Sequence, residues 1–259
     1  MTRATVRRAL AVLDPIFQSG AATRLVEAAV RQWASSVSRL QPDEALRRLL
    51  RLADQLYGRI DVLAVDLDGG IHAKHRLTRY HDFFVDHVGA GETVLDVGCG
   101  KGELAHDLAV RARARVTGID VNPRSVEFAR ARFAAPDLEF VQADVYAWDP
   151  PHTFDVVVMS NVLEHLRDRA AILRRLVAGA APGRVLIRVP SAERDWTVPL
   201  REELGLPHFS DPTHETEYTV GQLEHELSLA GLRIHELVQR WGELWAVAVP
   251  EGAAIVSAS

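Results

Sequence analysis

The stretch that decides the fold runs Val94-Leu95-Asp96-Val97-Gly98-Cys99-Gly100-Lys101-Gly102-Glu103. Its first four residues, mostly apolar, predict a buried strand, and an amphipathic segment follows Glu103. Three glycines stand between the two at alternate positions, where they let the backbone turn tightly and a ligand come close to it. The stretch therefore predicts a strand, a ligand-binding loop and a helix in succession.

Downstream of this loop, short apolar runs alternate with amphipathic segments. The strands expected from the apolar runs are Thr93–Val97, Arg115–Asp120, Leu138–Gln142, Asp155–Met159 and Arg184–Val189. Helices are expected to begin near Gly102, Pro123, Asp168 and Val220, and residues 233–239 and 244–249 are expected to form a terminal antiparallel hairpin. Strands that alternate with helices in this way form a mainly parallel sheet, so the fold class is α/β.

Acidic residues around the loop distinguish between two kinds of ligand. Asp120 ends the next expected strand about 20 residues on, where a carboxylate can hold both hydroxyls of a ribose. A nicotinamide dinucleotide would use the same features, but Asp96 before the glycines and Glu103 after them would repel its pyrophosphate. S-adenosylmethionine suits these carboxylates better, because it carries an ammonium and a sulfonium together with a ribose.

Four segments, in order, resemble the motifs of the class I S-adenosylmethionine-dependent methyltransferases. Residues 94–102 are similar to the first motif, 118–122 to the second, 142–145 to the third and 154–165 to the fourth. The resemblance covers most of the chain, from about Tyr80 to Pro250. It implies a Rossmann-like sheet of seven mostly parallel strands with an antiparallel C-terminal strand.

The resemblance also implies S-adenosylmethionine as the cofactor and S-adenosylhomocysteine as its demethylated product. The residues that it places at the cofactor are Asp96, Gly98, Gly100, Gly102, Asp120, Val121, Asn122, Asp144, Val145 and Ser160. Asp144 would face the exocyclic amine of the adenine. Upstream, the cation-rich segment 72–81 offers Arg76 or Tyr80 to the methionine carboxylate, with a solvated helix face as the alternative.

The residues before the loop are expected to form a helical appendage. Residues 1–70 show no alternation of strands and helices; one helix is expected over 21–40 and another from Gln41-Pro42-Asp43-Glu44, with proline and acids in its first turn. The expected organisation is an appendage over 1–70, a cofactor-binding domain over 71–250 and a tail over 251–259. The appendage is expected to cap the acceptor site or to form the surface of a homodimer.

The first 40 residues are rich in arginine and poor in acids, as organelle transit peptides are. Arginine outnumbers lysine along the whole chain, however, with Lys74 and Lys101 as the only lysines. The bias therefore indicates base composition rather than targeting, and a cytoplasmic location is expected. The single cysteine, Cys99, fits a reducing compartment.

Residues 63–70, Leu-Ala-Val-Asp-Leu-Asp-Gly-Gly, resemble the first motif of haloacid-dehalogenase-type phosphatases, whose first aspartate is the nucleophile. That family needs its own Rossmann-like domain after this motif. The chain that follows already has the methyltransferase order. We therefore interpret Asp66 and Asp68 as turn residues.

Composition favours a small-molecule acceptor. The net charge is −5, so the chain has no overall basic field for nucleic acid. No stretch approaches the ~18 consecutive apolar residues that a membrane span needs. A catalytically inactive cofactor-binding module is an alternative, but the intact Asp96, Asp120 and Asp144 give it no support.

The candidate catalytic residues are His165 and His214, expected to face the transferring methyl group from opposite sides of the pocket mouth. On a helix Asn161, Glu164 and His165 would share one face. With His214 they resemble the metal site of small-RNA 2′-O-methyltransferases, except that Asn161 replaces a glutamate. Losing that carboxylate weakens divalent binding, so we expect no metal and an imidazole base for O-methylation, in the biosynthesis of a natural product, glycan or quinone-like compound.

Overall fold

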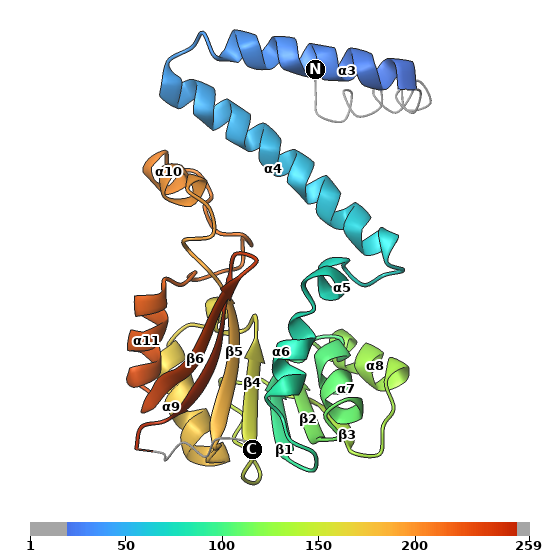
Figure 1. The fold of residues 1–259 in the computed structure, drawn as a ribbon, viewed down its shortest axis with the longest axis vertical. Helices are drawn as coiled ribbons and strands as arrows, with labels where there is room; N and C mark the ends of the chain where they lie inside the picture. Colours follow the sequence, from blue (N-terminus) through green and yellow to red (C-terminus); the bar gives the residue numbers. More distant parts are fainter. Residues whose placement is uncertain (1–19, 253–259) are drawn as a thin grey trace. The chain divides into compact units, whose positions relative to one another are not determined.

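The computed structural model describes residues 20–252, which form two compact units divided after His72. In the part of the first unit that the structure describes, the helices are α3 (Gly20–Val37) and α4 (Pro42–Leu67) (Figure 1). Pro42 stands in the first turn of α4 with Asp43 and Glu44, where proline loses no hydrogen bond and carboxylates meet the positive end of the helix dipole. The two helices expected over this region are confirmed.

Helix α4 continues through the phosphatase-like segment. It ends at Leu67, and Asp68 is its C-cap. The backbone then turns through Gly69 and Gly70, both with positive φ. A phosphatase nucleophile needs a strand at this place, so the rejection of that function agrees with the structure, whereas the interpretation of Asp66 as a turn residue is wrong because Asp66 lies within the helix.

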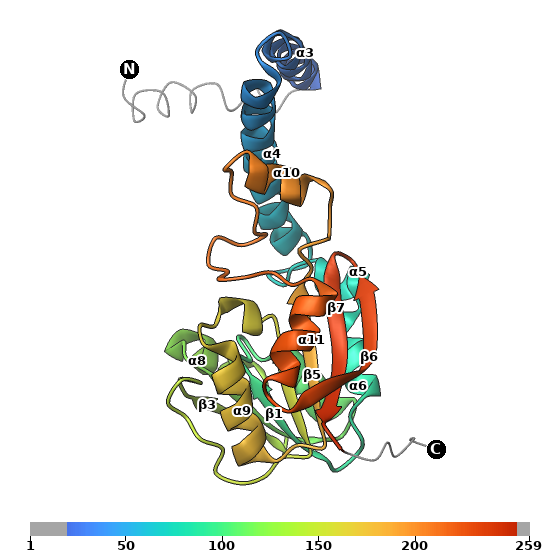
Figure 2. The same cartoon turned by 90° about the vertical axis from the view of Figure 1, so that its left-hand side faces the viewer.

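The second unit is built on a seven-stranded sheet with the order β3-β2-β1-β4-β5-β7-β6 (Figures 1 and 2). Its strands are β1 (Thr93–Val97), β2 (Arg115–Asp120), β3 (Leu138–Gln142), β4 (Val156–Ser160), β5 (Arg184–Pro190), β6 (Leu232–Arg240) and β7 (Glu243–Pro250). Each of the pairs among β1 to β5 is parallel, and β7 is antiparallel to both β5 and β6. The expected fold class and strand order along the chain are confirmed, with β4 shifted by one residue.

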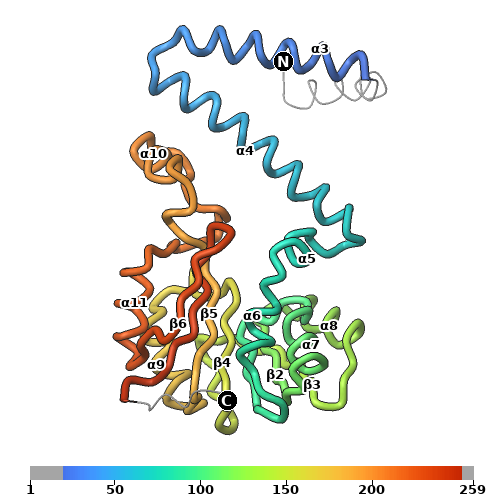
Figure 3. The backbone as a smooth tube through the Cα atoms, in the orientation of Figure 1, coloured from blue at the N-terminus to red at the C-terminus, as the bar shows by residue number. Residues whose placement is uncertain are grey.

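Helices cover both faces of the sheet, and the backbone tube in Figure 3 shows the same arrangement. The helices of this unit are α5 (Lys74–Thr78), α6 (Tyr80–Asp86), α7 (Glu103–Val110), α8 (Pro123–Arg132), α9 (Arg169–Ala180), α10 (Thr197–Glu203) and α11 (Val220–Ser228). Helices α6, α7 and α8 pack in one apolar cluster, and α9 and α11 pack in the other. Successive β4 residues alternate between the two clusters, since strand side chains point to opposite faces.

A tight turn closes the C-terminal hairpin. Trp241 and Gly242, between β6 and β7, both have positive φ (57° and 75°), which matches the twist of the flanking strands. Glu251 and Gly252 form a turn after β7, and the rest of the expected tail, residues 253–259, lies outside the described residues. Among the helices that the structure describes, none is long and apolar enough to cross a membrane.

Candidate active site

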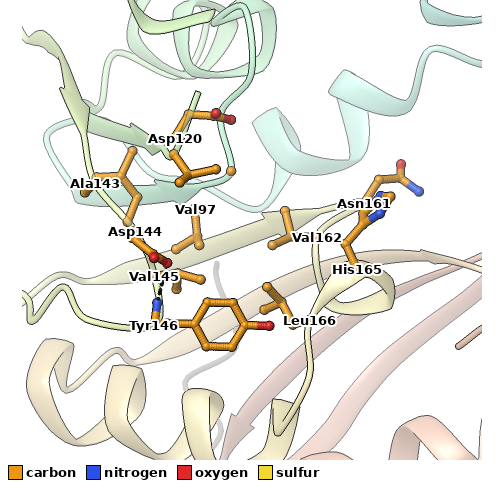
Figure 4. A pocket seen from close by; sticks show the side chains of 13 residues that line it. Val97, Asp120, Ala143, Asp144, Val145, Tyr146, Asn161, Val162, His165 and Leu166 are labelled. Carbon is orange, nitrogen blue, oxygen red and sulfur yellow. Dashed lines mark hydrogen bonds between the residues drawn. The ribbon is translucent and has the colours of Figure 1, made fainter. Parts of the chain in front are cut away.

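A cavity of about 370 Å³ opens at the carboxyl ends of the parallel strands (Figure 4). This is the edge where open α/β sheets bind their ligands. Of the residues expected at the cofactor, the cavity is lined by Gly98, Asp120, Val121, Asp144 and Val145, and His165 and Asn161 lie at the same cavity. The remaining lining residues are Val97, Ile119, Ala143, Tyr146, Val162 and Leu166.

The glycine loop is closely packed from two sides. Gly98, Gly100 and Gly102 all have positive φ, which disfavours other residues. A Cβ on Gly98 would stand 2.6 Å from Val162, and one on Gly102 would stand 2.6 Å from Phe140. The first and third glycines therefore let the loop lie against the core, and Gly102 also starts helix α7 as its N-cap.

The carboxylate of Asp120 is held against the loop by two backbone groups. The Gly100 N–H donates to its Oδ2 at 2.9 Å, and the Asn122 N–H donates to its Oδ1 at 2.8 Å. Each oxygen keeps a second lone pair for a ligand. The side chain of Asn122 serves another purpose, because its oxygen caps helix α8 by accepting the Arg124 N–H.

The far end of the cavity is an apolar slot with one acid. Asp144 accepts the backbone N–H of Tyr146 at 2.9 Å (Figure 4). The Tyr146 hydroxyl in turn accepts the Arg167 N–H at 2.7 Å, which fixes its ring beside Leu166. Sequence reasoning missed Tyr146, although its place directly after the third motif is a usable signal.

Asp96 is a buried acid near the end of strand β1, just before the loop. It is 2% exposed, and its Oδ2 has no hydrogen-bond partner among the described residues. Burial, together with the nearby Asp120 carboxylate, raises the pKa of Asp96 to about 8. Such a group favours a cationic ligand that would compensate its negative charge. Asp96 does not itself line the cavity.

The remaining expected cofactor residues, Tyr80, Arg76 and Ser160, lie outside the cavity lining. Tyr80 is buried, and its hydroxyl lies 3.1 Å from His75 Nδ1. The guanidinium carbon of Arg188 lies over the Tyr80 ring, 3.7 Å from the ring centroid. Arg76 is exposed on α5. Ser160, at the end of β4, has its hydroxyl 3.5 Å from the guanidinium of Arg188, which pairs with Glu243 through two hydrogen bonds.

The fourth motif does not form the expected helix. Asn161 has a positive φ of 56°, and only a short 3-10 turn, Leu163–His165, follows it. The expectation that Asn161, Glu164 and His165 share one helix face is therefore wrong. The sharp turn still brings two of them together, because the Asn161 side-chain amide donates to Glu164 Oε1 at 2.7 Å.

His165 and His214 lie side by side. Their ring centroids are 4.6 Å apart, so the expectation that they face the pocket mouth from opposite sides is wrong. The segment 211–214 folds back onto the turn after β4, and the backbone of Glu215 donates to the Glu164 carbonyl. That contact brings both imidazoles to one side of the site, and His165 alone of the two lines the cavity.

Hydrogen-bond contacts at Nδ1 fix the orientation of both imidazole rings. Thr213 donates its hydroxyl to Asp211 at 2.6 Å, so its oxygen accepts from His165 Nδ1 at 3.0 Å. His214 Nδ1 lies 3.0 Å from Glu217, which is buried. In the neutral form of each ring, these contacts favour the proton on Nδ1 and leave Nε2 as the acceptor. Sequence reasoning missed Thr213 and Glu217, whose roles depend on this fold-back.

The pKa shifts of His165 and Glu164 favour the neutral form of each side chain. Burial and the neighbouring His214 lower the pKa of His165, and burial raises the pKa of Glu164 to about 7. Glu164 is buried, with its Oε2 unpaired among the described residues. Ligand atoms of Glu164, His165 and His214 all lie within 4.8 Å of one another, a nitrogen-rich set that suits a transition metal better than magnesium.

Comparisons with known proteins agree with this architecture. A family model described as "Methyltransferase domain" matches residues 94–183. A ubiquinone biosynthesis O-methyltransferase of Neisseria meningitidis serogroup C is 44% identical over 89 residues, 32% of this chain and 37% of that protein. A trans-aconitate 2-methyltransferase of Shigella dysenteriae is 34% identical over 149 residues, 55% of this chain and 57% of that protein. The matches thus span about a third to somewhat over half of these curated relatives.

A solved structure shares the fold over a larger part of the chain. Magnesium protoporphyrin IX methyltransferase from Synechocystis, solved with bound S-adenosylhomocysteine, superposes with a TM-score of 0.56 at 21% identity. The match covers 70% of this chain and 85% of that one. The family model identifies residues 94–183 as a methyltransferase domain, and the motif order and sheet topology are those expected for the class I S-adenosylmethionine-dependent methyltransferases.

Proposed function

We propose that the protein transfers the methyl group of S-adenosylmethionine to an oxygen of a small-molecule acceptor. One observation carries the proposal. Asp120 presents its carboxylate to a cavity that ends in an apolar slot beside Asp144, and the Gly100 N–H holds that carboxylate in place. A ribose with an adenine attached fits this order of one acid, an apolar slot and a second acid.

The cofactor's charged part is assigned to the buried acid. With the ribose on Asp120, the methionine ammonium would lie toward Asp96, whose unpaired oxygen needs a donor. An ammonium there would restore the ionised form of Asp96 and satisfy that oxygen. The apolar side chains of Val97, Val145 and Leu166 would hold the adenine.

His165 is the proposed base. Methyl transfer is an in-line displacement, in which the acceptor oxygen bonds the methyl carbon while the carbon–sulfur bond breaks and sulfur keeps the electron pair. The acceptor's proton would pass to His165 Nε2, which is free because Nδ1 bonds Thr213. A lowered pKa keeps that nitrogen unprotonated near neutral pH.

A metal-assisted version of the same transfer is the second candidate. The observation that favours it is the unpaired Glu164 Oε2 within 4.8 Å of the two histidine ligand atoms. A bound metal would supply Lewis-acid activation of the acceptor hydroxyl. Nucleic acid as the acceptor has less support, since the chain carries a net charge of −5.

The proposed function is tested by turnover with S-adenosylmethionine and a panel of small hydroxylated, amino and carboxylic acceptors. We expect S-adenosylhomocysteine to form in step with one hydroxylated class, with and without a chelator. Methylation of amines alone would contradict O-transfer. No turnover across the panel, despite cofactor binding, would favour an inactive binding module.

The ionisation of Asp96 leads to a prediction about pH. Its pKa of about 8 lies above the ordinary value of 3.8, so the free protein holds it protonated below pH 8. The ammonium binds the ionised form, so cofactor affinity should rise as pH increases toward 8, and binding at about pH 6.5 should release close to one proton. Calorimetry in buffers of different ionisation enthalpy measures this release.

Two controls accompany the pH measurement. The variant Asp96→Asn cannot release the proton, and methylthioadenosine, which has no ammonium, should bind without release. A wild-type protein that releases no proton at about pH 6.5 would contradict the pairing of Asp96 with the ammonium.

A further inference from the structure

Helix α4 carries an apolar seam with coiled-coil spacing. Its core positions are Leu46, Leu49, Ala53, Leu56, Ile60, Leu63 and Leu67. These residues follow one another at alternating steps of three and four, the repeat by which two helices pack along a common seam. A surface helix that packs only on its own protein needs no such strict repeat.

The described residues leave the second half of this seam exposed. Helix α3 lies along the first half of α4, where the groove between the two helices is lined from α4 by residues between Arg48 and Gln55. Beyond that groove, Leu56, Ile60, Leu63 and Leu67 are 56 to 76% exposed. Four large aliphatic side chains on one stripe of a helix mark an interaction surface.

The four exposed positions are arranged symmetrically about the midpoint between Asp61 and Val62. If a second α4 lies antiparallel across this midpoint, Leu56 meets the partner's Leu67, and Ile60 meets the partner's Leu63. The same contacts repeat on the other side of the two-fold axis, so the surface is complementary to itself. Each aliphatic side chain then has an aliphatic partner.

Charge supports the same pairing. Arg59 and Asp66 flank the seam on one side, and neither forms an ion pair within the described helices. In the antiparallel register Arg59 lies opposite the partner's Asp66. Because of the two-fold symmetry, Asp66 also lies opposite the partner's Arg59, so two ion pairs can form. In a parallel register Arg59 would lie beside the partner's Ala64, with no charge to meet.

We propose that α4 pairs with the α4 of a second copy of this chain, as an antiparallel two-helix seam centred between Asp61 and Val62. This assigns residues 56–67 of α4 to self-association, independently of the methyl-transfer proposal. From the sequence, the appendage was expected either to cap the acceptor site or to form the surface of a homodimer, and the proposal favours the homodimer surface.

The test is the mass of the full chain in solution. We expect sedimentation equilibrium to give a concentration-dependent mass approaching twice 28.6 kDa. Leu56→Asp combined with Leu63→Asp should raise the dimer dissociation constant at least about a hundredfold, because each carboxylate would be buried against the partner. Circular dichroism checks that the variant remains helical.

A matched control is Val62→Asp. Val62 is 54% exposed on the same helix but lies off the seam, so this variant should stay dimeric. A wild-type mass that stays at 28.6 kDa over the whole concentration range would overturn the proposal. So would a dimer that survives the double substitution, since its interface would then lie elsewhere.

Two further variants test the orientation. Arg59→Asp should weaken the dimer roughly tenfold, and adding Asp66→Arg should restore it. Under oxidation, Ile60→Cys with Leu63→Cys should cross-link across the antiparallel seam, whereas Ile60→Cys alone should not. Efficient cross-linking of the single variant would show a parallel pair and overturn the proposed register.

Discussion

Replacing His165 by alanine should lower turnover on the order of 10²–10⁴-fold while leaving the affinity for S-adenosylmethionine unchanged. His165 lines the cavity, and its Nε2 is free because Nδ1 bonds Thr213. Removing a positioned base slows the step in which the acceptor loses its proton, but the cofactor's own contacts remain. Single-turnover kinetics and calorimetry on the same preparation separate these two effects.

The control for this variant is His152→Ala. His152 precedes β4, so it lies at the edge of the sheet opposite the cavity, and its loss should leave turnover intact. Thr213→Val should lower turnover less than His165→Ala, since it removes only the group that holds the ring. Full activity in His165→Ala would mean that the acceptor needs no protein base.

Chelation distinguishes the base from a metal. A base titrates, so the pH profile of turnover should fall on the acid side with the pKa of His165, and a chelator should change nothing. If a chelator abolishes turnover and a divalent ion restores it, Asn161, Glu164, His165 and His214 are the ligands to test. That outcome would overturn the metal-free base.

Replacing Asp120 by alanine should weaken the binding of S-adenosylmethionine more than tenfold, a loss of about 1.5–3 kcal/mol. The loss has two sources. The ribose would lose a charged acceptor, and the Gly100 and Asn122 N–H groups would lose theirs. Calorimetric titration of the purified variant measures the affinity directly.

Asp120→Asn helps to separate the two sources. Asparagine keeps one acceptor oxygen for the loop but loses the charge and one oxygen toward the ribose, so its affinity should fall between wild type and alanine. Asp137→Ala is the matched control, because Asp137 is exposed before β3, at the opposite edge of the sheet. Unchanged binding in Asp120→Ala would contradict the assignment of Asp120 to the ribose.

The sheet could be predicted from sequence because its signals are local. The apolar run before Gly98 and the acid that ends β2 can each be recognised from a few adjacent residues. The antiparallel hairpin followed from two apolar runs separated by a short turn at Trp241 and Gly242. Periodicity and turn chemistry were therefore sufficient for the fold.

The catalytic cluster could not be predicted in the same way, because it depends on contacts between distant residues. Asn161 adopts a left-handed conformation that helical spacing does not foresee. His165 meets His214 only because the segment after β5 folds back and hydrogen-bonds the Glu164 carbonyl. The side-chain partners Thr213 and Glu217, which fix the imidazoles, follow from that same contact.

The central claim is that the cavity at the glycine loop binds S-adenosylmethionine, and calorimetric titration of the full chain tests it most directly. We expect S-adenosylmethionine and S-adenosylhomocysteine to bind with one site per chain, and NADH to give no comparable heat, because the Glu103 carboxylate in the first turn of α7 opposes a pyrophosphate and the buried Asp96 offers it no cation. Tight NADH binding, or the absence of S-adenosylmethionine binding by folded protein, would contradict the account.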